Sequence, residues 1–518
     1  MKKGIALVLT AVLMLSLCAC TVDPDSYTPT GDGLTWDEDY TGPVYTHPNQ
    51  AGEQKLTLIY YPEEGFNPLL TSDFTNRALF TLLYQSLFSV DRDYNVHPIL
   101  CKEYSMSQDM KTYTFYLESA TFSDGSAVTA QDVAATLNAA RSSSYYAGRF
   151  AHIHTVSLGE NGSVVIQTDV PMENLPILLD IPILKESQLQ ETMPLGSGPY
   201  LLDNSTGNPL LRRRGDWWCK AELAARAPAI TLVTAEDAPQ IRDTFEFFEL
   251  DLVCADPGSD RYADYRCDYE LWDCENGIFL YLFCNMQSPV FSVPEVRSAL
   301  TFSIDRDTIA AAYFRGFGRG ASLPASPLSP YYSQVQAEKY DYDGTGETLK
   351  NAVSGANLVG NPVVLLVNSD DSLRVRVARD VGKALTDAGL AVQMLEVGGS
   401  TYRKHLKERT FDLCLGQTKL SPNMDLSAFF DKKGALNYGG IADVSLYSLA
   451  TESLANHGNY YTLHQNVMDD GRVCPILFSS YAVYATRGLL TDLSPSRDNV
   501  FFYTLGKTME QALVKQEN

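Results

Sequence analysis

The chain has 518 residues, 45% of them hydrophobic and 11% aromatic, so it can bury a large core and form two to four domains. Its formal net charge is −23 at pH 7. Such an acidic chain disfavours nucleic acid and anionic lipid surfaces as partners, because proteins bind both through basic patches. It also disfavours a highly anionic ligand unless a local basic pocket overrides the field.

The first 20 residues have the pattern of a secretory signal peptide. Lys2 and Lys3 precede an apolar stretch that ends at Cys20 and is short for a spanning helix. Its last four residues, Leu17-Cys18-Ala19-Cys20, resemble the lipobox of bacterial lipoproteins. The resemblance implies a signal peptide over 1–20, lipidation of Cys20, and attachment to the extracytoplasmic side of the cell membrane. An ordinary cleaved signal and an uncleaved anchor are the alternatives.

Residues 21–54 differ sharply from the rest of the chain. They contain seven Asp or Glu, no Lys or Arg, and many Thr, Pro and Gly. Such a segment buries too little apolar surface to offset the entropy lost on ordering. It is therefore predicted to be a flexible acidic stalk.

From residue 55 onward, strand-like segments alternate with amphipathic helices, which predicts α/β lobes. Residues 55–70 predict a strand followed by a turn at Gly65-Phe66-Asn67-Pro68. Residues 72–91 have apolar side chains at helical spacing, and residues 111–118 alternate as a strand does. Thr129 is the expected N-cap of a helix that extends to residue 141.

The second half contains a strand–helix–strand unit over residues 360–397. We expect Ser372 to cap its helix and Gly389 to end it. Residues 410–418 predict one more strand, which leads directly into a loop.

The sequence offers little for catalysis or metal binding. It has no GxSxG, HExxH or P-loop pattern. His152 and His154 could lie on one face of a strand, but two solvated or hydrogen-bonded histidines are favoured over a metal site. No cofactor and no enzymatic activity are therefore expected.

Eight cysteines remain after Cys18 and Cys20, and none forms a CxxC pair, which disfavours a zinc cluster. An oxidising exterior permits disulfides, and Cys254, Cys267 and Cys274 are close enough in sequence to pair. Buried free thiols are equally compatible with a body of this size.

Three ordered motifs characterise the middle of the chain. They are Pro98-x-Leu100 followed by Tyr113-Thr114-Phe115, Phe122-x-Asp124-Gly125 and Thr129-Ala130-x-Asp132-Val133; then Gly196-Ser197-Gly198-Pro199-Tyr200; then Val296-Arg297-x-Ala299-Leu300 and Ile304-Asp305-Arg306. Together they resemble the extracytoplasmic solute-binding proteins of the peptide/nickel/opine class, family 5, which serve ABC importers. Cys101 stands where the family pattern has alanine. We expect Phe122, Asp124-Gly125, Arg297 and Asp305-Arg306 to stabilise the fold rather than to contact solute.

The resemblance implies an α/β, two-lobed periplasmic-binding-protein-like fold (type II, cluster C) with an extra α/β domain inserted in the first lobe. Lobe I is predicted over 55–95, 190–278 and 485–518, the inserted domain over 96–189, and lobe II over 279–484. Asn285 and Gly198 are the expected hinge positions, since the family's chain crosses between lobes near them.

The resemblance also implies the ligand-binding residues. Phe66 and Asn67 are expected to face the solute from one lobe, and Thr418, Lys419 and Asp425 from the other. Alignment on Asp425 places Pro422 where peptide-binding members have the aspartate that pairs with the peptide's amino group. Asp425 either replaces that aspartate or caps the following helix, and Lys419 either meets an acidic or carbonyl group or is solvated.

The function implied is that of a monomeric, membrane-tethered receptor. It would capture a peptide or another small solute in the cleft between lobes and deliver it to an ABC transporter permease. A solute sensor, a sugar or metal-chelate binding protein, and an unrecognised surface hydrolase are the alternatives.

Overall fold

The computed structural model describes residues 54–205, 207–219, 221–259, 262–490, 492–497 and 499–514. The predicted signal peptide, the lipidation site Cys20 and all but the last residue of the predicted stalk lie outside the described residues.

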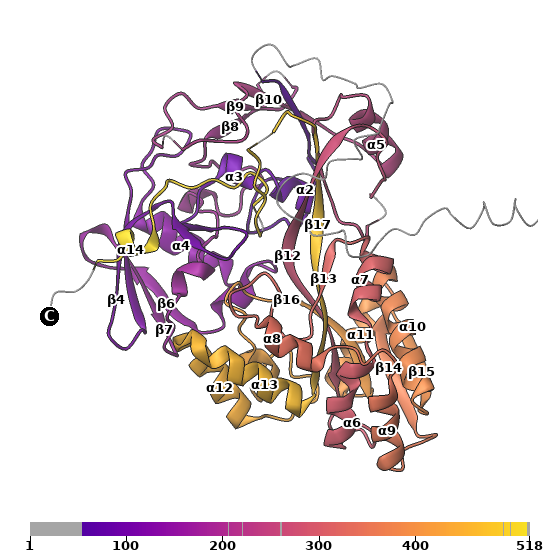
Figure 1. Cartoon of the computed structure of the whole chain (residues 1–518). Coiled ribbons are helices and arrows are strands. Elements are labelled where there is room, and N and C mark those ends of the chain that lie inside the picture. The colour runs from indigo at the N-terminus through magenta and orange to yellow at the C-terminus, as the bar shows by residue number, and fades with distance from the viewer. Residues whose placement is uncertain are drawn as a thin grey trace, which may run out of the picture. The chain divides into compact units, whose positions relative to one another are not determined.

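One mixed sheet of eleven strands forms the centre of the fold (Figure 1). In spatial order its strands are β15 (Ala391–Val397), β14 (Pro362–Asn368), β16 (Leu413–Lys419), β12 (Tyr269–Cys284), β17 (Val473–Thr486), β11 (Leu252–Ala255), β1 (Leu56–Ile59), β10 (Ala229–Val233), β9 (Leu210–Arg213) and β8 (Tyr200–Asp203), and β13 (Gly318–Gly320) also pairs with β17. The strands on the two sides of the β12–β17 pair belong to different lobes, so the fold has two lobes that share these two long strands.

The chain passes from lobe I to lobe II at an irregularity in β12. The pairing of β12 with β17 is interrupted between Glu275 and Phe279. Before the interruption, β17 also pairs with β11 of lobe I; after it, β12 pairs with β16 of lobe II, starting at Ile278 and Lys419. We call residues 275–278 the crossing bulge. The predicted domain bounds, including the lobe boundary after residue 278, stay predictions.

In lobe I, the prediction of a long helix from the apolar spacing over residues 72–91 is wrong. Two short helices, α2 (Phe74–Arg77) and α3 (Phe80–Leu83), are followed by an extended chain and the strand β2 (Phe88–Val90). The apolar spacing reflects burial, but the backbone around Gly198 packs directly on the end of α3, and the Gly198 amide donates to the Leu83 carbonyl at 2.9 Å. A tertiary contact therefore ends the helix.

A hairpin pairs β2 of lobe I with β3 (Val96–Pro98) at the start of the inserted domain. The inserted domain contains a separate antiparallel sheet, in spatial order β4 (Cys101–Met106), β5 (Thr112–Leu117), β7 (Val164–Thr168) and β6 (Ile153–Leu158), and the helix α4 (Ala130–Ala140). The predicted strand at 111–118 and helix at 129–141 are confirmed. Thr129 and Asp132 form a capping box, in which each side chain accepts from the other residue's backbone amide.

The Phe122-x-Asp124-Gly125 motif has the structural role predicted for it. Phe122 is completely buried, and the Asp124 carboxylate accepts from the Ser126 amide at 3.0 Å. Thr121 and Ala127 then pair across the turn. The motif therefore fixes a tight reversal just before α4.

Helices surround the lobe II part of the sheet, and Figure 1 shows α12 and α13 on the side of the inserted domain. Besides α2 and α3, the helices that the structure describes outside the inserted domain are α5 (Ala238–Glu246), α6 (Pro294–Ala299), α7 (Arg306–Phe314), α8 (Gln334–Ala337), α9 (Glu347–Gly355), α10 (Ser372–Asp387), α11 (Gly399–Glu408), α12 (Val444–Ala455), α13 (Tyr460–Asp470) and α14 (Met509–Ala512). The predicted strand–helix–strand unit is confirmed as β14, α10 and parallel β15. Its cap lies one residue earlier than predicted, because Asp371, not Ser372, accepts from the Arg374 amide.

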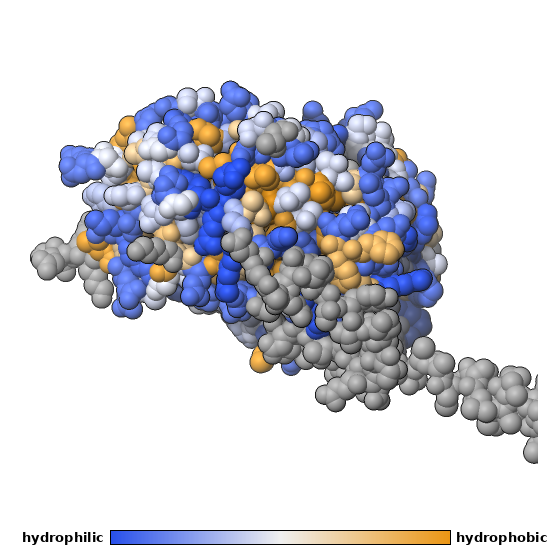
Figure 2. Space-filling model, turned by 90° about the horizontal axis from the view of Figure 1, so that it is seen from above, coloured by the Kyte–Doolittle hydropathy of each residue, from blue (hydrophilic) through white to orange (hydrophobic). Residues whose placement is uncertain are grey.

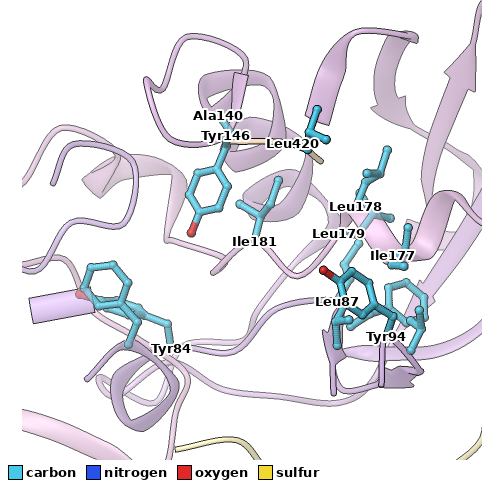
Figure 3. Close-up of a cluster of buried hydrophobic side chains, with 14 of the residues drawn as sticks. Tyr84, Leu87, Tyr94, Ala140, Tyr146, Ile177, Leu178, Leu179, Ile181 and Leu420 are labelled. Carbon is cyan, nitrogen blue, oxygen red and sulfur yellow. The ribbon is translucent and has the colours of Figure 1, made fainter. Parts of the chain in front are cut away.

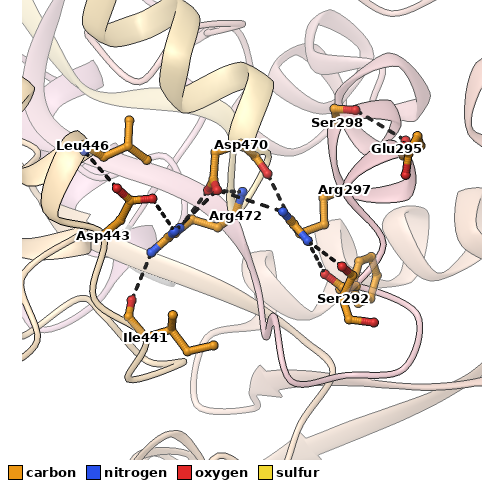
Figure 4. A network of polar contacts seen from close by, with 10 residues as sticks. Ser292, Glu295, Arg297, Ser298, Ile441, Asp443, Leu446, Asp470 and Arg472 are labelled. Atoms are coloured by element: carbon orange, nitrogen blue, oxygen red, sulfur yellow. Dashed lines mark hydrogen bonds and ion pairs between the residues drawn. The ribbon is translucent and has the colours of Figure 1, made fainter.

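Arg297 belongs to a polar network inside lobe II, as predicted (Figure 4). Its guanidinium donates to the carbonyls of Asp470 and Phe291 at 2.9 and 2.8 Å. Arg472, also buried, donates to the carboxylates of Asp470 and Asp443 at 2.7 and 3.2 Å. The network ties the start of β17 to α6 and to the cap of α12.

The largest hydrophobic core is continuous across lobe I, the inserted domain and part of lobe II. Figure 3 shows Leu420, from the loop after β16, together with Tyr146 and Ile181 of the inserted domain. A second core fills the space between the lobe II strands and α6, α7 and α10. The lobes therefore meet through packed apolar side chains as well as through the crossing strands.

The face seen in Figure 2 mixes hydrophilic and hydrophobic residues, with hydrophobic residues gathered beside a band of hydrophilic ones. In the part of the chain that the structure describes, no helix combines the length and hydrophobicity needed to cross a bilayer.

Candidate functional site

A cavity of about 490 Å³, here called the cleft pocket, opens at the carboxyl ends of the parallel strands β1 and β11. It is lined by Ile59, Tyr61, Ser72, Asp73, Phe74, Thr75, Ile241, Val253, Cys254, Ala255, Asp256, Ser259 and Tyr481. In open α/β sheets, ligands bind outside the carboxyl ends of the strands. The volume of the cleft pocket is in the range of sites that bind small molecules.

The cleft pocket lies at the border between the lobes. Tyr481 is on β17, one of the two strands that both lobes share. The loop that carries Asp256 touches lobe II, since a side chain at Gly258 would overlap Leu373 at the start of α10. A movement of the lobes would therefore change the pocket.

The lining combines aromatic surface with carboxylates. Phe74 and Tyr481 stack with ring centroids 3.6 Å apart. Asp73 caps α2 by accepting from the Asn76 amide at 3.0 Å. Desolvation by the surrounding protein, and then the charge of Asp371 in lobe II, raise the pKa of Asp256 above its ordinary value. The pocket thus combines an apolar wall with hydrogen-bond acceptors.

The predicted ligand residues Phe66 and Asn67 lie in a buried turn of lobe I, each 1% exposed. Phe66 stacks on Tyr60. The Asn67 amide donates to the carbonyls of Leu189 and Glu191 at 3.0 and 2.7 Å, and its oxygen accepts from the Leu69 amide. These contacts give Asn67 a role in shaping the turn, and contact with solute stays a prediction for both residues.

The segment Ser72–Thr75, a few residues further along, lines the cleft pocket and was not among the residues predicted from the sequence. A signal for it existed, because Asp73 followed by an apolar run is a typical start of a helix. The expectation of one long helix over 72–91 concealed this start.

Thr418 and Lys419 end β16 beside the crossing bulge, and both are half-buried. The Lys419 ammonium donates to the Tyr145 hydroxyl at 3.1 Å and to the Asn276 carbonyl at 2.5 Å. It also lies 4.4 Å from the centroid of the Tyr145 ring. Lys419 therefore links lobe II to the inserted domain, and a contact with solute stays a prediction.

Asp425 is buried against the inserted domain. Its carboxylate lies 3.1 Å from Nε2 of His152 and accepts from the Ser427 amide at 2.8 Å. Burial acts to raise the pKa of Asp425, but the hydrogen bond and charge of His152 outweigh it and lower the pKa. The capping alternative is wrong in its residue, because the N-cap of the following 3₁₀ turn, Ser427–Phe429, is Leu426, which makes no side-chain cap hydrogen bond. Asp425 supports this turn from the position before the cap, through the Ser427 amide.

The partner of Asp425 is His152, which the sequence predicts only as a solvated or hydrogen-bonded histidine beside His154. His154 is exposed and lies 3.3 Å from Asp169, whereas His152 is buried and faces lobe II. The two histidines therefore have separate environments. Nothing in the spacing along the chain indicated the His152–Asp425 pair.

His152, Asp425 and Ser427 are also the residue types of a hydrolytic triad. Ser427 Oγ lies 2.9 Å from His152 Nε2, the same nitrogen that faces Asp425. A catalytic relay needs the serine and the carboxylate on opposite ring nitrogens. This arrangement therefore has the geometry of an ion pair with a supporting hydroxyl.

The expected hinge residues lie away from the crossing bulge. Asn285 follows the last residue of β12 in lobe II, where its amide donates to the Phe411 carbonyl at 2.8 Å. Gly198 lies against α3 in lobe I. Their hinge roles stay predictions, and the crossing bulge is the place where the strands change neighbours.

The crossing bulge is held by buried polar contacts from several parts of the chain. The hydroxyls of Tyr94 in lobe I and Ser326 in lobe II both donate to the Glu275 carboxylate. Gly277 has a φ of +69° and lies directly against the Arg497 guanidinium, which donates to the Leu420 carbonyl. The bulge thus contacts both lobes.

The family described as "Bacterial extracellular solute-binding proteins, family 5 Middle" matches residues 95–436, about two thirds of the chain. The glutathione-binding protein GsiB of Salmonella typhi is 24% identical over 325 residues, which cover 60% of this chain and 63% of GsiB. The match therefore spans less than two thirds of that relative's length.

Solved structures show the same fold. The oligopeptide-binding protein AppA of Bacillus subtilis, in complex with a nonapeptide, has a TM-score of 0.62 at 19% identity, covering 88% of this chain and 100% of AppA. NikA of Brucella suis, in complex with Fe(III)-EDTA, has a TM-score of 0.66 at 19% identity, covering 83% of this chain and 95% of NikA. At this identity the likeness shows the fold alone, and it confirms the predicted two-lobed architecture. Because the family model matches about two thirds of the chain and the fold agrees with it, the chain belongs to family 5 of the bacterial extracellular solute-binding proteins.

Proposed function

We propose that the protein is a receptor that captures a solute in the cleft pocket, closes its lobes over it and delivers it to an ABC transporter permease. The observation that carries the proposal is the position of the cleft pocket, at the carboxyl ends of β1 and β11 and beside lobe II. Lobes joined by two crossing strands can close by hinge motion and trap a ligand at such a border. The receptor acts as a monomer.

The proposed solute is a peptide or peptide-like molecule. One relative is named for glutathione, and two solved structures with this fold are complexes with a nonapeptide and with Fe(III)-EDTA, so the fold serves solutes of several kinds. Sensing, or binding of a sugar or metal chelate, are the alternatives. An ABC permease encoded beside the gene would favour delivery over sensing.

The first prediction tests capture. A screen of peptides, oligosaccharides and metal chelates should include a solute that raises the melting temperature, because a ligand at a hundredfold excess over Kd stabilises the folded state by about 2.7 kcal/mol. The same solute should lower the radius of gyration in solution scattering. Ser72→Trp, which fills the cleft pocket, should abolish the shift, whereas Ser187→Trp on an exposed turn of the inserted domain should preserve it. A solute that stabilises the Ser72 variant as much as the natural protein would place the site elsewhere.

The second prediction concerns the solute's amino group. Pro422 offers no carboxylate, and Asp425 is paired with His152 inside the protein. A buried ammonium without a carboxylate partner is strongly disfavoured. N-acetylated peptides should therefore bind at least as well as the free peptides. A free peptide that binds about tenfold tighter, the effect of a contact of about 1.4 kcal/mol, would place its amino group at the cleft-pocket carboxylates Asp73 and Asp256 instead. Isothermal titration of matched pairs decides this, and a free peptide that loses its advantage in Asp425→Asn would show that Asp425 binds the amine after all.

The third prediction concerns membrane attachment. We propose that the protein is held at the extracytoplasmic face of the membrane through a lipid on Cys20. Cys20→Ser should remove incorporation of labelled palmitate and move the protein from the membrane fraction to the soluble fraction. Cys18→Ser is the matched control and should leave both unchanged. Labelled fatty acid on the Cys20 variant would contradict the assignment.

A further inference from the structure

Two histidines and two carboxylates lie where the inserted domain meets lobe II, and one pair is buried. His152 precedes β6 of the inserted domain, and Asp425 belongs to the loop after β16 in lobe II. Their side chains are 8% and 9% exposed, and Nε2 of His152 lies 3.1 Å from the Asp425 carboxylate. The second pair, His457 and Glu173, is 3.8 Å apart and largely exposed. The buried pair is therefore the stronger ionic contact across this interface.

We propose that the His152–Asp425 pair is a proton-dependent latch, which holds the inserted domain against lobe II when His152 is charged and loosens when it is neutral. The latch goes beyond solute capture, because it acts on the balance between closed and open lobes whatever the solute is.

The charge balance around His152 favours its protonated form in the closed state. Asp425 faces the ring from lobe II, and Asp169 lies at the end of β7 on the same domain. Burial acts to lower the pKa of His152, but the hydrogen bond and charge of Asp425, with the charge of Asp169, outweigh it and raise the pKa above its ordinary value of 6.5. A neutral ring would leave the buried Asp425 carboxylate without its cation, which is costly in a dry interface.

The remaining groups near the ring do not reverse this balance. On α4, Arg141 directs its guanidinium to the carbonyls of Ile153 and His154. Tyr447 on α12 and Tyr460 on α13 have pKa values raised by burial and by neighbouring carboxylates, so both stay neutral. Ser427 supplies a hydroxyl to both partners of the pair.

The direction of the effect follows from proton linkage. Opening separates His152 from Asp425 and returns its pKa toward 6.5, so closure takes up a proton. The latch is fully present below the open-state pKa and is lost as pH rises through the raised closed-state pKa. Each unit of difference between the two pKa values changes the closed-to-open ratio about tenfold.

Besides the exposed His457–Glu173 pair, two contacts across the interface involve no titratable group. The Glu173 amide donates to the Leu454 carbonyl at 2.8 Å, and Leu420 packs into the shared core. These contacts stabilise the closed arrangement at every pH, and the His152–Asp425 pair adds stability that depends on pH.

The test compares the full-length chain with three variants: His152→Gln, Asp425→Asn and the matched control His154→Gln, which removes the exposed histidine two residues away. Histidine NMR of the natural protein should show one ring with a pKa above 6.5, absent in His152→Gln and lowered in Asp425→Asn. Solution scattering from about pH 6 to pH 9 should show the natural protein and His154→Gln expanding as pH rises.

In His152→Gln the radius of gyration should no longer change with pH over this range. A His152 pKa at or below 6.5, or the same pH response in His152→Gln as in the natural protein, overturns the latch. The NMR titration needs no variant to fold, so a poorly folded substitution leaves the proposal falsifiable. A protein that binds solute but has a pH-independent radius would keep the proposed function and lose the latch.

Discussion

Replacing Arg149 by methionine should lower the free energy of unfolding by about 3–5 kcal/mol, the usual effect of removing one partner of a buried ion pair. Arg149 and Asp180 form an ion pair inside the inserted domain, with side chains 4% and 1% exposed. Arg149 also donates to the Leu178 carbonyl at 3.3 Å. Without the guanidinium, the Asp180 carboxylate would be left as an uncompensated charge in the core. Urea denaturation followed by circular dichroism measures the loss.

Two controls separate the buried charge from other effects. The exposed pair Arg212–Asp203 has side chains 55% and 19% exposed, so Arg212→Met should cost less than about 1 kcal/mol. In the double variant Arg149→Met with Asp180→Leu, most of the lost stability should return, because an apolar pair of similar volume can replace a buried ion pair. A double variant as unstable as Arg149→Met would mean that lost packing, and not the uncompensated charge of Asp180, causes the loss of stability.

The second large effect is expected at the crossing bulge, where Gly277→Ala should destabilise the protein by about 2.5–5 kcal/mol. The positive φ of Gly277 costs an alanine about 1–2 kcal/mol. Its new methyl group would lie about 2.3 Å from the Arg497 guanidinium, which is 3% exposed and donates to the Leu420 carbonyl. Moving that guanidinium breaks a charged hydrogen bond worth about 1.5–3 kcal/mol.

The matched control for Gly277 is Gly344→Ala. Gly344 has a φ of +77° and open space where the methyl group would lie, so only the backbone strain of about 1–2 kcal/mol is expected. Because the bulge joins the lobes, Gly277→Ala should also change the pH dependence of the radius of gyration, and Gly344→Ala should not. Equal destabilisation by the two substitutions would show that the Arg497 contact adapts at no cost.

Local sequence determined the elements whose stabilising contacts lie a few residues apart. The cap of α4 is one case, since Thr129 and Asp132 bond each other's backbone amides. The turn at Asp124 is another, because its carboxylate accepts from an amide two residues later. The alternation in β5 and the β14–α10–β15 unit were predicted for the same reason: periodicity along the chain reports which face is buried.

The helix predicted over 72–91 shows where this reasoning stops. Its apolar spacing was real, but the backbone at Gly198, more than 100 positions away, packs against Leu83 and ends the helix. Such a contact leaves no trace in the periodicity of the segment. The same applies to Asn67, whose amide is occupied by two carbonyls near residue 190.

For function, the motifs that stabilise the fold were enough to identify the family from the sequence. Which side chains meet is visible only in the folded chain: the cleft pocket joins Ser72, Cys254 and Tyr481, and the latch joins His152 to a loop about 270 positions later. The physical reason is that burial and charge pairing depend on distance in space. A single sequence records distance along the chain, and the two agree only within a helix, a turn or a pair of adjacent strands.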